Sequence, residues 1–326
     1  MIVTKTPFRV SFFGGGTDYP AYFERYGGAV LGTAIDKSLF LSATHFYSRL
    51  FDYSIRISYR QVECVKTVDD VEHRAFREIF RRCGVTGDIE VNCAAELPAY
   101  TGIGSSSTFV VGLLNTIMAH QGKFMTPMEL AYEAIRIEQD VLEEHVGCQD
   151  QTFAAVGGLN VIEFRRRDDI IVHRIPLSPE RMDELESWMM LFYTGIRRRA
   201  SDQAAKQVAR IEDNINRLHR MRALVDKAYE ALVAPNGLTQ FAALLDDSWR
   251  QKAALAPEVS NDTINTIYDA GREAGALGGK LLGAGAGGFV LFLVPPEARA
   301  AVRQRLAHVE EVPVRINAVG SHVVYA

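Results

Sequence analysis

The amino-acid sequence predicts an α+β protein with two domains. At 326 residues, of which 48% are hydrophobic and 23% are charged, the chain is long enough for two cores. Strand-like and helix-like segments follow one another without the steady alternation of a doubly wound sheet. A charged stretch with two prolines, "PLSPERMDELES" at 176–187, separates two such halves. We therefore expect an N-terminal domain over residues 1–185 and a C-terminal domain over residues 186–326.

The first half opens with strand-like segments. Residues 2–13 and 29–46 have strand composition, and the segment 88–98 is a further strand that Pro98 stops. A helix is expected from about Ser107 to His120, where apolar residues recur at helical spacing.

The next helix along the chain has explicit start signals. Thr126 suits the N-cap position, and Pro127 suits the first turn. Glu129 stands three residues after Thr126, as a capping box requires. We expect this helix to run to about His145 and to end at Gly147.

Strands and helices continue on both sides of the boundary. Strands are expected at 158–164, 170–177 and 188–195, and long helices at about 200–233 and 238–255. Residues 262–276 predict one more helix. The run "FVLFLV" at 289–294 is a strand that comes directly after the last glycine-rich segment.

Composition excludes several classes of function. The net charge of −4 argues against a general nucleic-acid binder, which carries a basic excess. No apolar run is long enough to cross a bilayer, and the first residues lack a signal peptide's apolar core. The four cysteines are scattered without a C-x-x-C pair, which indicates a reducing compartment and no cysteine-built zinc site. We therefore expect a cytoplasmic protein that binds neither nucleic acid nor membranes.

Three glycine-rich segments stand out, at 12–19, 101–107 and 283–288. The last fits G-x-G-x-x-G by letter, but it opens a strand, whereas the dinucleotide fingerprint opens a helix. None is a P-loop, because no Gly-Lys-Ser or Gly-Lys-Thr occurs. The sequence therefore excludes these two nucleotide-binding motifs.

The middle segment, "TGIGSSS", suits an anion. Gly102 and Gly104 permit turns that bring amide groups close to a ligand. Ser105, Ser106 and Ser107 then occupy the first turn of a helix, where free N–H groups favour phosphate and hydroxyls suit Mg²⁺. A plain helix cap is the other interpretation, and this segment alone leaves the two open.

Two acidic residues, Glu138 and Asp150, bear on the interpretation of this segment. Glu138 falls on the apolar stripe of the helix that begins at Pro127, where a carboxylate is costly unless it is paired or binds a metal. Asp150 comes just past that helix. Taken singly, Glu138 at the stripe's edge and Asp150 in a turn are the simpler interpretations. With a phosphate-binding turn they supply a cation ligand and a carboxylate for phosphoryl transfer.

The N-terminal segment supplies groups for an acceptor. Arg9 lies in a predicted strand, and an arginine near a transferred phosphate stabilises its charge. Asp18 comes after the triple glycine and can accept hydrogen bonds from a polyol. The alternatives are a surface strand residue for Arg9 and an Asx turn for Asp18.

Four segments in this order carry a resemblance: "TPFRVSFFGGGTDY", "LPAYTGIGSSS", "EQDVLEEHVGCQDQ" and "GGKLLGAGAGGF". Over residues 6–289 the chain resembles the GHMP small-molecule kinases, and "GGGTDY" and "CQDQ" most resemble their sugar-1-phosphate-forming members. The resemblance implies an α+β fold: an N-terminal domain with a left-handed βαβ crossover and a ferredoxin-like C-terminal domain. It also implies ATP and Mg²⁺ as cofactors and a sugar or sugar phosphate as acceptor.

The resemblance implies a role for each matching residue. Asp150 matches the catalytic base, Arg9 its arginine partner, and Glu138 the metal-binding glutamate, with Ser106 as the first choice for a second magnesium ligand. The loop over the ATP phosphates would comprise Thr101, Gly102, Gly104, Ser105, Ser106 and Ser107. The substrate-binding positions would be Asp18, Gly15, Gly16, Arg198 and Gly285.

Departures from the family pattern bear on the substrate. Gly15 and Gly16 replace the Glu-His of galactokinases, Tyr100 replaces a small residue, and Ala286 interrupts a glycine run. Arg198, in "YTGIRRRAS", would bind the phosphate of a phosphosugar, although a solvated basic loop is an equal alternative. The runner-up acceptors are L-fucose, galactose and an N-acetylhexosamine, and a non-catalytic sugar sensor is the rival class. The sequence leaves open whether the chain forms a homodimer.

Overall fold

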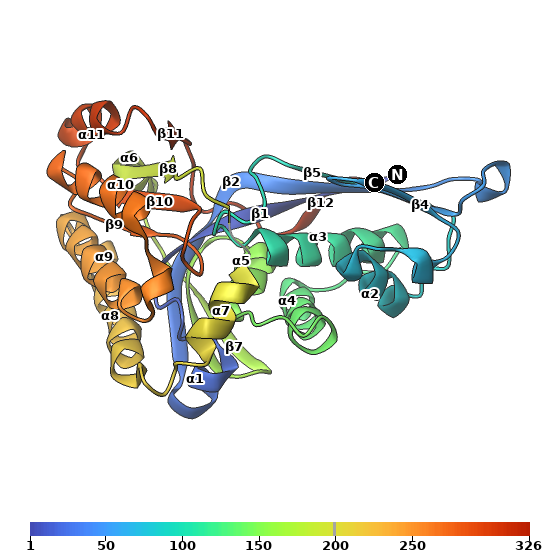
Figure 1. Cartoon of the computed structure of the whole chain (residues 1–326), viewed down its shortest axis with the longest axis horizontal. Coiled ribbons are helices and arrows are strands. Elements are labelled where there is room, and N and C mark those ends of the chain that lie inside the picture. Colours follow the sequence, from blue (N-terminus) through green and yellow to red (C-terminus); the bar gives the residue numbers. More distant parts are fainter. Residues whose placement is uncertain (198–199) are drawn as a thin grey trace.

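The computed structural model describes residues 1–197 and 200–326, with the backbone alone for residues 200–203. Two long antiparallel strands, β1 (Ile2–Phe13) and β2 (Gly28–His45), run through the centre of an eight-stranded sheet (Figure 1). Both strands match the predicted segments. Most β1 side chains from Thr6 onward are buried, because this strand is covered by helices on one side and by the second domain at its end.

The rest of the first sheet is arranged around β2. Its later half pairs with β5 (Ile89–Ala95), and its earlier half pairs with β6 (Leu159–Arg166), so one strand serves two partners in turn. β7 (Asp169–Arg174) extends the sheet beyond β6. β3 (Ile55–Ser58) runs parallel to β5, so the chain between these two strands makes a crossover connection. β4 (Val62–Val65) closes that edge.

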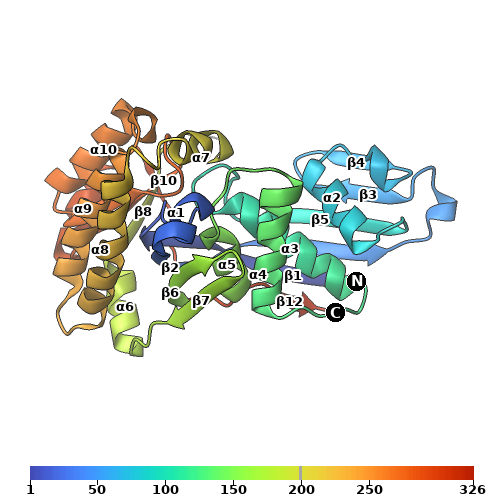
Figure 2. The same cartoon turned by 90° about the horizontal axis from the view of Figure 1, so that it is seen from below.

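Helices cover one face of this sheet (Figure 2). They are α2 (Arg74–Cys83), α3 (Ser105–His120), α4 (Pro127–Arg136) and α5 (Gln149–Val156), while α1 (Pro20–Tyr26) links β1 to β2. Thr126 and Glu129 form the predicted capping box at the start of α4. The predicted extension of that helix to His145 is wrong, because the α-helix ends at Arg136 and a π-helical turn occupies Ile137–Val141.

The second sheet has the order β11-β8-β10-β9, with every neighbouring pair antiparallel. Its strands are β8 (Met189–Tyr193), β9 (Gly278–Leu281), β10 (Phe289–Leu293) and β11 (Glu310–Glu311). Numbered along the chain, this order is 4-1-3-2, which is the expected ferredoxin-like order. The last strand, β12 (His322–Tyr325), leaves this sheet and pairs with β1.

The helices of the second half are α6 (Pro179–Trp188), α7 (Ala200–Val208), α8 (Ile215–Val233), α9 (Leu238–Ala253), α10 (Asp262–Glu273) and α11 (Arg299–Arg305). The single helix predicted over 200–233 is therefore two helices. Short 3₁₀ turns lie at Ser48–Leu50, Val68–Asp70, Pro257–Val259 and Pro296–Ala298. Among the described residues, none of the helices combines the length and apolar content of a membrane span.

The two halves are joined by apolar packing at the ends of β1 and β2. α8 lies against both strands, and α9 bridges β9 and β1. The ring of Phe241 in α9 meets Phe12 and Phe13 edge-on, with centroids 5.5 and 5.1 Å apart. Edge-on aromatic pairs add to the free energy of apolar burial. This contact holds the second half directly over the segment that carries Arg9.

Candidate active site

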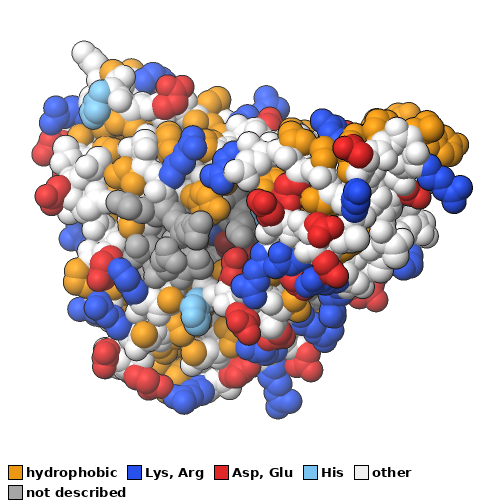
Figure 3. Space-filling view, turned by 45° about the vertical axis from the view of Figure 1, so that its right-hand side comes forward, with side chains coloured by type: hydrophobic (Ala, Val, Ile, Leu, Met, Phe, Trp, Pro, Cys, Tyr) orange, Lys and Arg blue, Asp and Glu red, His pale blue; other side chains and the backbone are white. Residues whose placement is uncertain are grey.

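A cavity of about 1240 Å³ opens where the two halves meet. Its walls come from β1, the segment 95–107, α3, the segment 142–150 and, from the second half, α7, α9, β9 and the turn 283–284. Acidic and basic side chains are interspersed over the face of the molecule in Figure 3. The glycine-rich segments, the serines and the acidic residues predicted from the sequence lie in this cavity or directly behind it.

The segment from Pro98 to Ser107, here called the serine loop, is the wall nearest the start of α3. Tyr100, Gly102 and Gly104 have φ angles of +66°, +80° and +79°, so alternate residues adopt the left-handed conformation. Such alternation turns successive amide groups towards one side and forms a concave site for an anion. The loop ends at the N-terminus of a 16-residue helix, whose free N–H groups favour negative charge.

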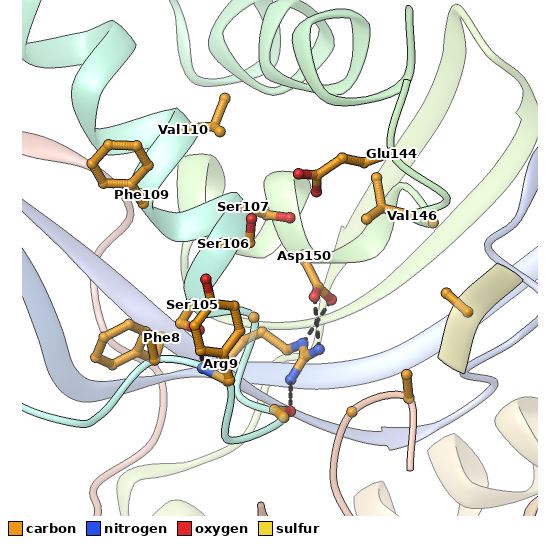
Figure 4. Close-up of a pocket in the computed structure, with 18 of the residues that line it drawn as sticks. Phe8, Arg9, Ser105, Ser106, Ser107, Phe109, Val110, Glu144, Val146 and Asp150 are labelled. Carbon is orange, nitrogen blue, oxygen red and sulfur yellow. Dashed lines mark hydrogen bonds and ion pairs between the residues drawn. The ribbon is translucent and has the colours of Figure 1, made fainter. Parts of the chain in front are cut away.

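The three serines do not act as helix caps. Gly104 is the N-cap residue of α3, and no side chain of the described chain caps it. Ser105 Oγ accepts a hydrogen bond from the Tyr100 N–H at 3.2 Å, whereas Ser106 is exposed to the cavity and Ser107 is buried. Of the two interpretations of this segment, simple capping is excluded, and the hydroxyls of Ser106 and Ser107 lie beside the cavity (Figure 4).

Arg9 and Asp150 form a two-bond pair next to the serine loop (Figure 4). Arg9 Nε donates to Oδ1 and Nη2 donates to Oδ2 of Asp150, each at 2.8 Å. Arg9 Nη1 donates to the carbonyl of Gly102 at 2.6 Å. Arg9 is 4% exposed, while the Asp150 side chain is 25% exposed and lines the cavity. The pair therefore fixes the orientation of a carboxylate that ligands can reach, and Arg9 is not a surface strand residue.

Glu138 is fully buried in the π-helical turn, a type of turn that is frequent at functional sites. Gln151 Nε2 donates to its Oε2 at 2.5 Å, and Oε1 has no hydrogen-bond partner among the described residues. Burial raises the pKa of Glu138 to about 8, while the nearby Ser107 hydroxyl and the Gln151 amide lower it. A buried carboxylate oxygen without a partner, beside a serine hydroxyl, fits Mg²⁺, which prefers hard oxygen ligands.

Asp18 ties the N-terminal glycine segment to α5. Its Oδ1 accepts from the Gly16 N–H at 2.9 Å, and its Oδ2 accepts from the Gln149 N–H at 3.4 Å. The first bond comes from two residues before Asp18, so the side chain does not form an Asx turn. Burial raises the pKa of Asp18, against these backbone hydrogen bonds. Asp18, Gly15 and Gly16 all line the cavity.

The last glycine segment joins β9 to β10, and it is here called the glycine hairpin (residues 282–288). A Cβ atom on Gly283 would lie 2.4 Å from Cα of Gly102, and one on Gly288 would lie 2.2 Å from the carbonyl oxygen of Thr101. The Phe289 N–H donates to that same carbonyl at 3.2 Å. The hairpin therefore supports the serine loop from behind, backbone against backbone.

Three other predicted site residues occupy different surroundings. Thr101 is fully buried and its hydroxyl donates to the Pro98 carbonyl at 2.8 Å, so it shapes the serine loop from within. Gly285, with a φ of +111°, lies against Val259, where a Cβ atom would be 2.8 Å from Cα. Arg198 lies outside the described residues. Its neighbour Arg197 lines the cavity.

Sequence reasoning missed two buried lysines in the cavity wall. Lys252 in α9 donates to the carbonyl of Gly283, and Lys280 in β9 donates to the carbonyl of Phe12 at 2.8 Å. Both are nine-tenths or more buried. Lys252 follows Leu245 and Trp249 on the buried face of its helix. A charged residue on an apolar helix face is also the pattern that identified Glu138. The carboxylate of Glu144, also missed, points into the cavity near Ser107 (Figure 4).

Comparisons with known proteins show the family of the chain. The model of the GHMP kinases N terminal domain matches residues 70–158, and the model of the GHMP kinases C terminal matches residues 228–311. The D-glycero-alpha-D-manno-heptose 7-phosphate kinase of Campylobacter jejuni is 31% identical over 95% of both chains. The L-fucokinase/L-fucose-1-P guanylyltransferase of Bacteroides fragilis is 26% identical over 95% of this chain and 36% of its own length.

The fold also matches solved structures. A crystal structure of a D-glycero-D-manno-heptose 1-phosphate kinase from Bacteroides thetaiotaomicron superposes over the whole of both chains, with a TM-score of 0.82 and 24% identity. At that identity the likeness speaks for the fold alone. The two-domain architecture of this chain is therefore the architecture of that protein.

Proposed function

As the chain belongs to the GHMP kinase family, we propose that it transfers the γ-phosphoryl group of ATP to the anomeric hydroxyl of D-glycero-D-manno-heptose 7-phosphate. The family and its heptose kinase relative make the chain an ATP-dependent sugar kinase. The product of the proposed reaction is the 1,7-bisphosphate, a step towards nucleotide-activated heptose for surface polysaccharides. The observation that carries the proposal is the Arg9–Asp150 pair beside the serine loop, in a chain 31% identical to a heptose 7-phosphate kinase.

Asp150 is the proposed base. Each of its carboxylate oxygens accepts one hydrogen bond from Arg9, which leaves lone pairs for the proton of an acceptor hydroxyl. As that hydroxyl oxygen bonds to the γ-phosphorus, its proton passes to Asp150, and the β–γ bridging oxygen leaves with the electron pair of its bond. Arg9 keeps the carboxylate in one orientation throughout this step.

The serine loop is the proposed site of the ATP phosphates. Its left-handed turns and the N-terminus of α3 provide N–H donors for phosphate oxygens. Ser106, or the neighbouring Ser107, together with Glu138 would hold Mg²⁺. The cation neutralises charge on the β- and γ-phosphates when it is bound. The orphaned Oε1 of Glu138 supports this assignment.

The phosphate of the proposed acceptor needs cationic partners. Arg197 lines the cavity, and Arg198, which lies outside the described residues, is the position that matches the family's arginine. Arginine binds phosphate with two parallel hydrogen bonds, which suits a phosphosugar. The 26% identity to the L-fucokinase over 95% of this chain favours a free sugar as the second candidate.

A panel of acceptors with γ-labelled ATP tests the proposal. We expect heptose 7-phosphate to be turned over with the highest kcat/KM, and free L-fucose, galactose and N-acetylhexosamines at least about a hundredfold less efficiently, because a site built for phosphate leaves its cations unpaired without it. Turnover of a free hexose but not of the heptose phosphate would show the acceptor to be wrong. Absence of turnover with every sugar would instead favour a sugar sensor.

A further inference from the structure

Three cationic side chains are buried at the floor of the cavity, where the two halves meet. Arg9 comes from β1, Lys252 from α9 and Lys280 from β9, and they are 4%, 6% and 2% exposed. All three line the cavity that also contains Asp18 and Asp150. Burial of a cation is costly, so each of them has to be stabilised by a partner.

Two of the three bind groups of the first half. Arg9 donates three hydrogen bonds, two to the Asp150 carboxylate and one to the Gly102 carbonyl. Lys280 donates to the Phe12 carbonyl at 2.8 Å and so connects β9 to the end of β1. Burial, and then the neighbouring charge of Lys252, lower the pKa of Lys280 well below its usual range. Lys280 therefore connects the two halves through this hydrogen bond.

Lys252 binds the glycine hairpin of the second half instead. In the described part of the chain, Lys252 Nζ donates one hydrogen bond, to the Gly283 carbonyl, whereas an ammonium group has three donors. Its pKa is lowered to about 8, first by burial and then by Arg9, while Asp18 and Asp150 oppose that change. The side chain is therefore mostly protonated at neutral pH.

A short path of contacts connects Lys252 to the reacting groups. Lys252 holds the carbonyl of Gly283, and Gly283 lies against Gly102 with backbone atoms in contact. The Gly102 carbonyl accepts from Arg9, which holds both oxygens of Asp150. The Lys252 ammonium thus lines the cavity next to the serine loop, on the side of the second half.

The geometry points to Lys252 as a catalytic cation of phosphoryl transfer, contributed by the C-terminal domain. This inference rests on the proposed kinase function and extends it. As the acceptor oxygen bonds to the γ-phosphorus and its proton passes to Asp150, the bond to the β–γ bridging oxygen breaks with its electron pair going to ADP. Lys252 forms no covalent bond in this step. It binds and stabilises the negative charge on the transferring phosphoryl oxygens.

The serine loop explains why a cation from elsewhere is needed. Residues 98–107 contain no lysine or arginine, unlike a P-loop, whose lysine reaches the β- and γ-phosphates. Arg9 is bound to the base, so its charge is largely neutralised by Asp150. Lys252 donates to the glycine hairpin that lies against the serine loop, so domain packing brings a buried lysine of the cavity next to that loop.

Substitution of Lys252 by methionine, which has a similar shape and no charge, tests the inference. We expect Lys252→Met to lower kcat about 10²- to 10³-fold with the KM for ATP within about threefold of wild type, since one charge-stabilising donor is lost. The kcat of Lys252→Arg should be at least about tenfold higher than that of Lys252→Met, because arginine restores the positive charge. Lys227→Met, the same change at an exposed position of α8, is the matched control and should behave as wild type.

A second measurement separates charge stabilisation from a purely structural role at Gly283. The affinity of each variant for ADP·Mg²⁺ is compared with that for ADP·Mg²⁺ plus aluminium fluoride, which mimics the transferring phosphoryl group. Lys252→Met should weaken the fluoride complex by the same factor as kcat and leave ADP binding unchanged. Equal weakening of both complexes, or a kcat within threefold of wild type, would overturn the inference.

The fluoride titration needs no sugar, so it separates this inference from the choice of acceptor. If heptose 7-phosphate is not turned over but the fluoride complex depends on Lys252, the acceptor is wrong and the cation assignment stands. If the heptose phosphate is turned over and Lys252→Met keeps full activity, the acceptor stands and the cation assignment is wrong.

Discussion

The serine loop and the glycine hairpin are both glycine-rich, and they lie back to back, yet they differ in the surroundings that their backbones face. The serine loop turns its amides towards the cavity and ends at the N-terminus of α3. The glycine hairpin turns its backbone onto the serine loop, where Cβ atoms on Gly283 and Gly288 would lie within 2.4 Å of backbone atoms.

This difference teaches that glycine serves two separate needs in one site. In the serine loop it permits left-handed turns beside a ligand, and in the glycine hairpin it permits two chain segments to touch. The glycines themselves do not distinguish the two uses. The element that follows each loop distinguishes them, because the serine loop leads into a helix that begins with serine hydroxyls and the glycine hairpin leads into a strand.

The largest effect is expected from removing the carboxylate that the serine loop faces. Asp150→Asn should reduce kcat about 10³-fold, because the amide cannot take the acceptor's proton, while it can still accept one hydrogen bond from Arg9. ATP affinity, measured by titration, should change less than threefold. Asp226→Asn on the surface of α8 is the control. A kcat for Asp150→Asn within tenfold of wild type would remove Asp150 from the role of base.

The comparison itself is tested by placing a methyl group in each loop. Gly283→Ala puts a Cβ 2.4 Å from the backbone of Gly102 and should lower the free energy of unfolding by about 3 kcal/mol. Gly104→Ala meets nothing closer than 3.3 Å, a contact that a small shift of the Arg9 and Asp150 side chains relieves, so its main cost is the left-handed φ, about 1 kcal/mol. Denaturant unfolding of both variants measures the difference. Equal losses would contradict the division of roles between the two loops.

The proposed Mg²⁺ site at Glu138 can be tested by the pH dependence of stability. Its folded pKa of about 8 lies above the unfolded value of 4.5, so the folded state binds more protons between these values. The unliganded protein should therefore lose stability as pH rises from about 5 to 8, by on the order of a few kcal/mol. Glu138→Gln should flatten this slope and abolish Mg²⁺-dependent turnover. Parallel pH profiles for the two proteins would show that Glu138 is ionised throughout.

The smallest effects are expected where each loop carries one residue other than glycine in the left-handed conformation. Tyr100 in the serine loop and Ala286 in the glycine hairpin both have a φ of +66°. Tyr100→Gly and Ala286→Gly should each stabilise the fold by about 0.5–1 kcal/mol, as the strain relieved exceeds the added chain entropy. Thermal unfolding measures both, with Ala119→Gly in α3 as a control of opposite sign. Destabilisation by both glycines would mean that these side chains contribute packing that outweighs the strain.

Local rules predicted part of the structure well. The capping box of Thr126 and Glu129 placed the start of α4, and alternating composition placed β1 and β2. The predicted end of α4 was wrong, because a π-helical turn that contains the buried Glu138 follows Arg136, and regular helical spacing does not predict such a turn. β3 and β4 were missed, since short strands with mixed exposure carry little periodic signal. α2 was also missed, although its buried residues Phe76, Ile79 and Phe80 recur at helical spacing.

The candidate site was predictable wherever a polar residue broke an apolar stripe or a turn carried unusual residues. Glu138 and the serines stood out in this way, and family resemblance linked Arg9 to Asp150 across 141 residues of sequence. Lys252 also interrupts the apolar face of its helix, as Glu138 does, but its place next to the serine loop depends on how the two domains dock. Docking is a tertiary property that no local pattern encodes. The roles of these residues stay predictions until they are tested.

The return of β12 to the first sheet has a consequence for how the protein is made. Val3 near the start of β1 pairs with Tyr325, and the bridge of Ile35 to Ile316 adds a second long-range tie. During synthesis on the ribosome, the edge of β1 that pairs with β12 therefore remains unpaired until residues 322–325 have emerged. Contacts this distant along the chain form slowly, and an open strand edge invites pairing with other chains. The order of synthesis thus makes the first sheet among the last parts of the molecule to be completed.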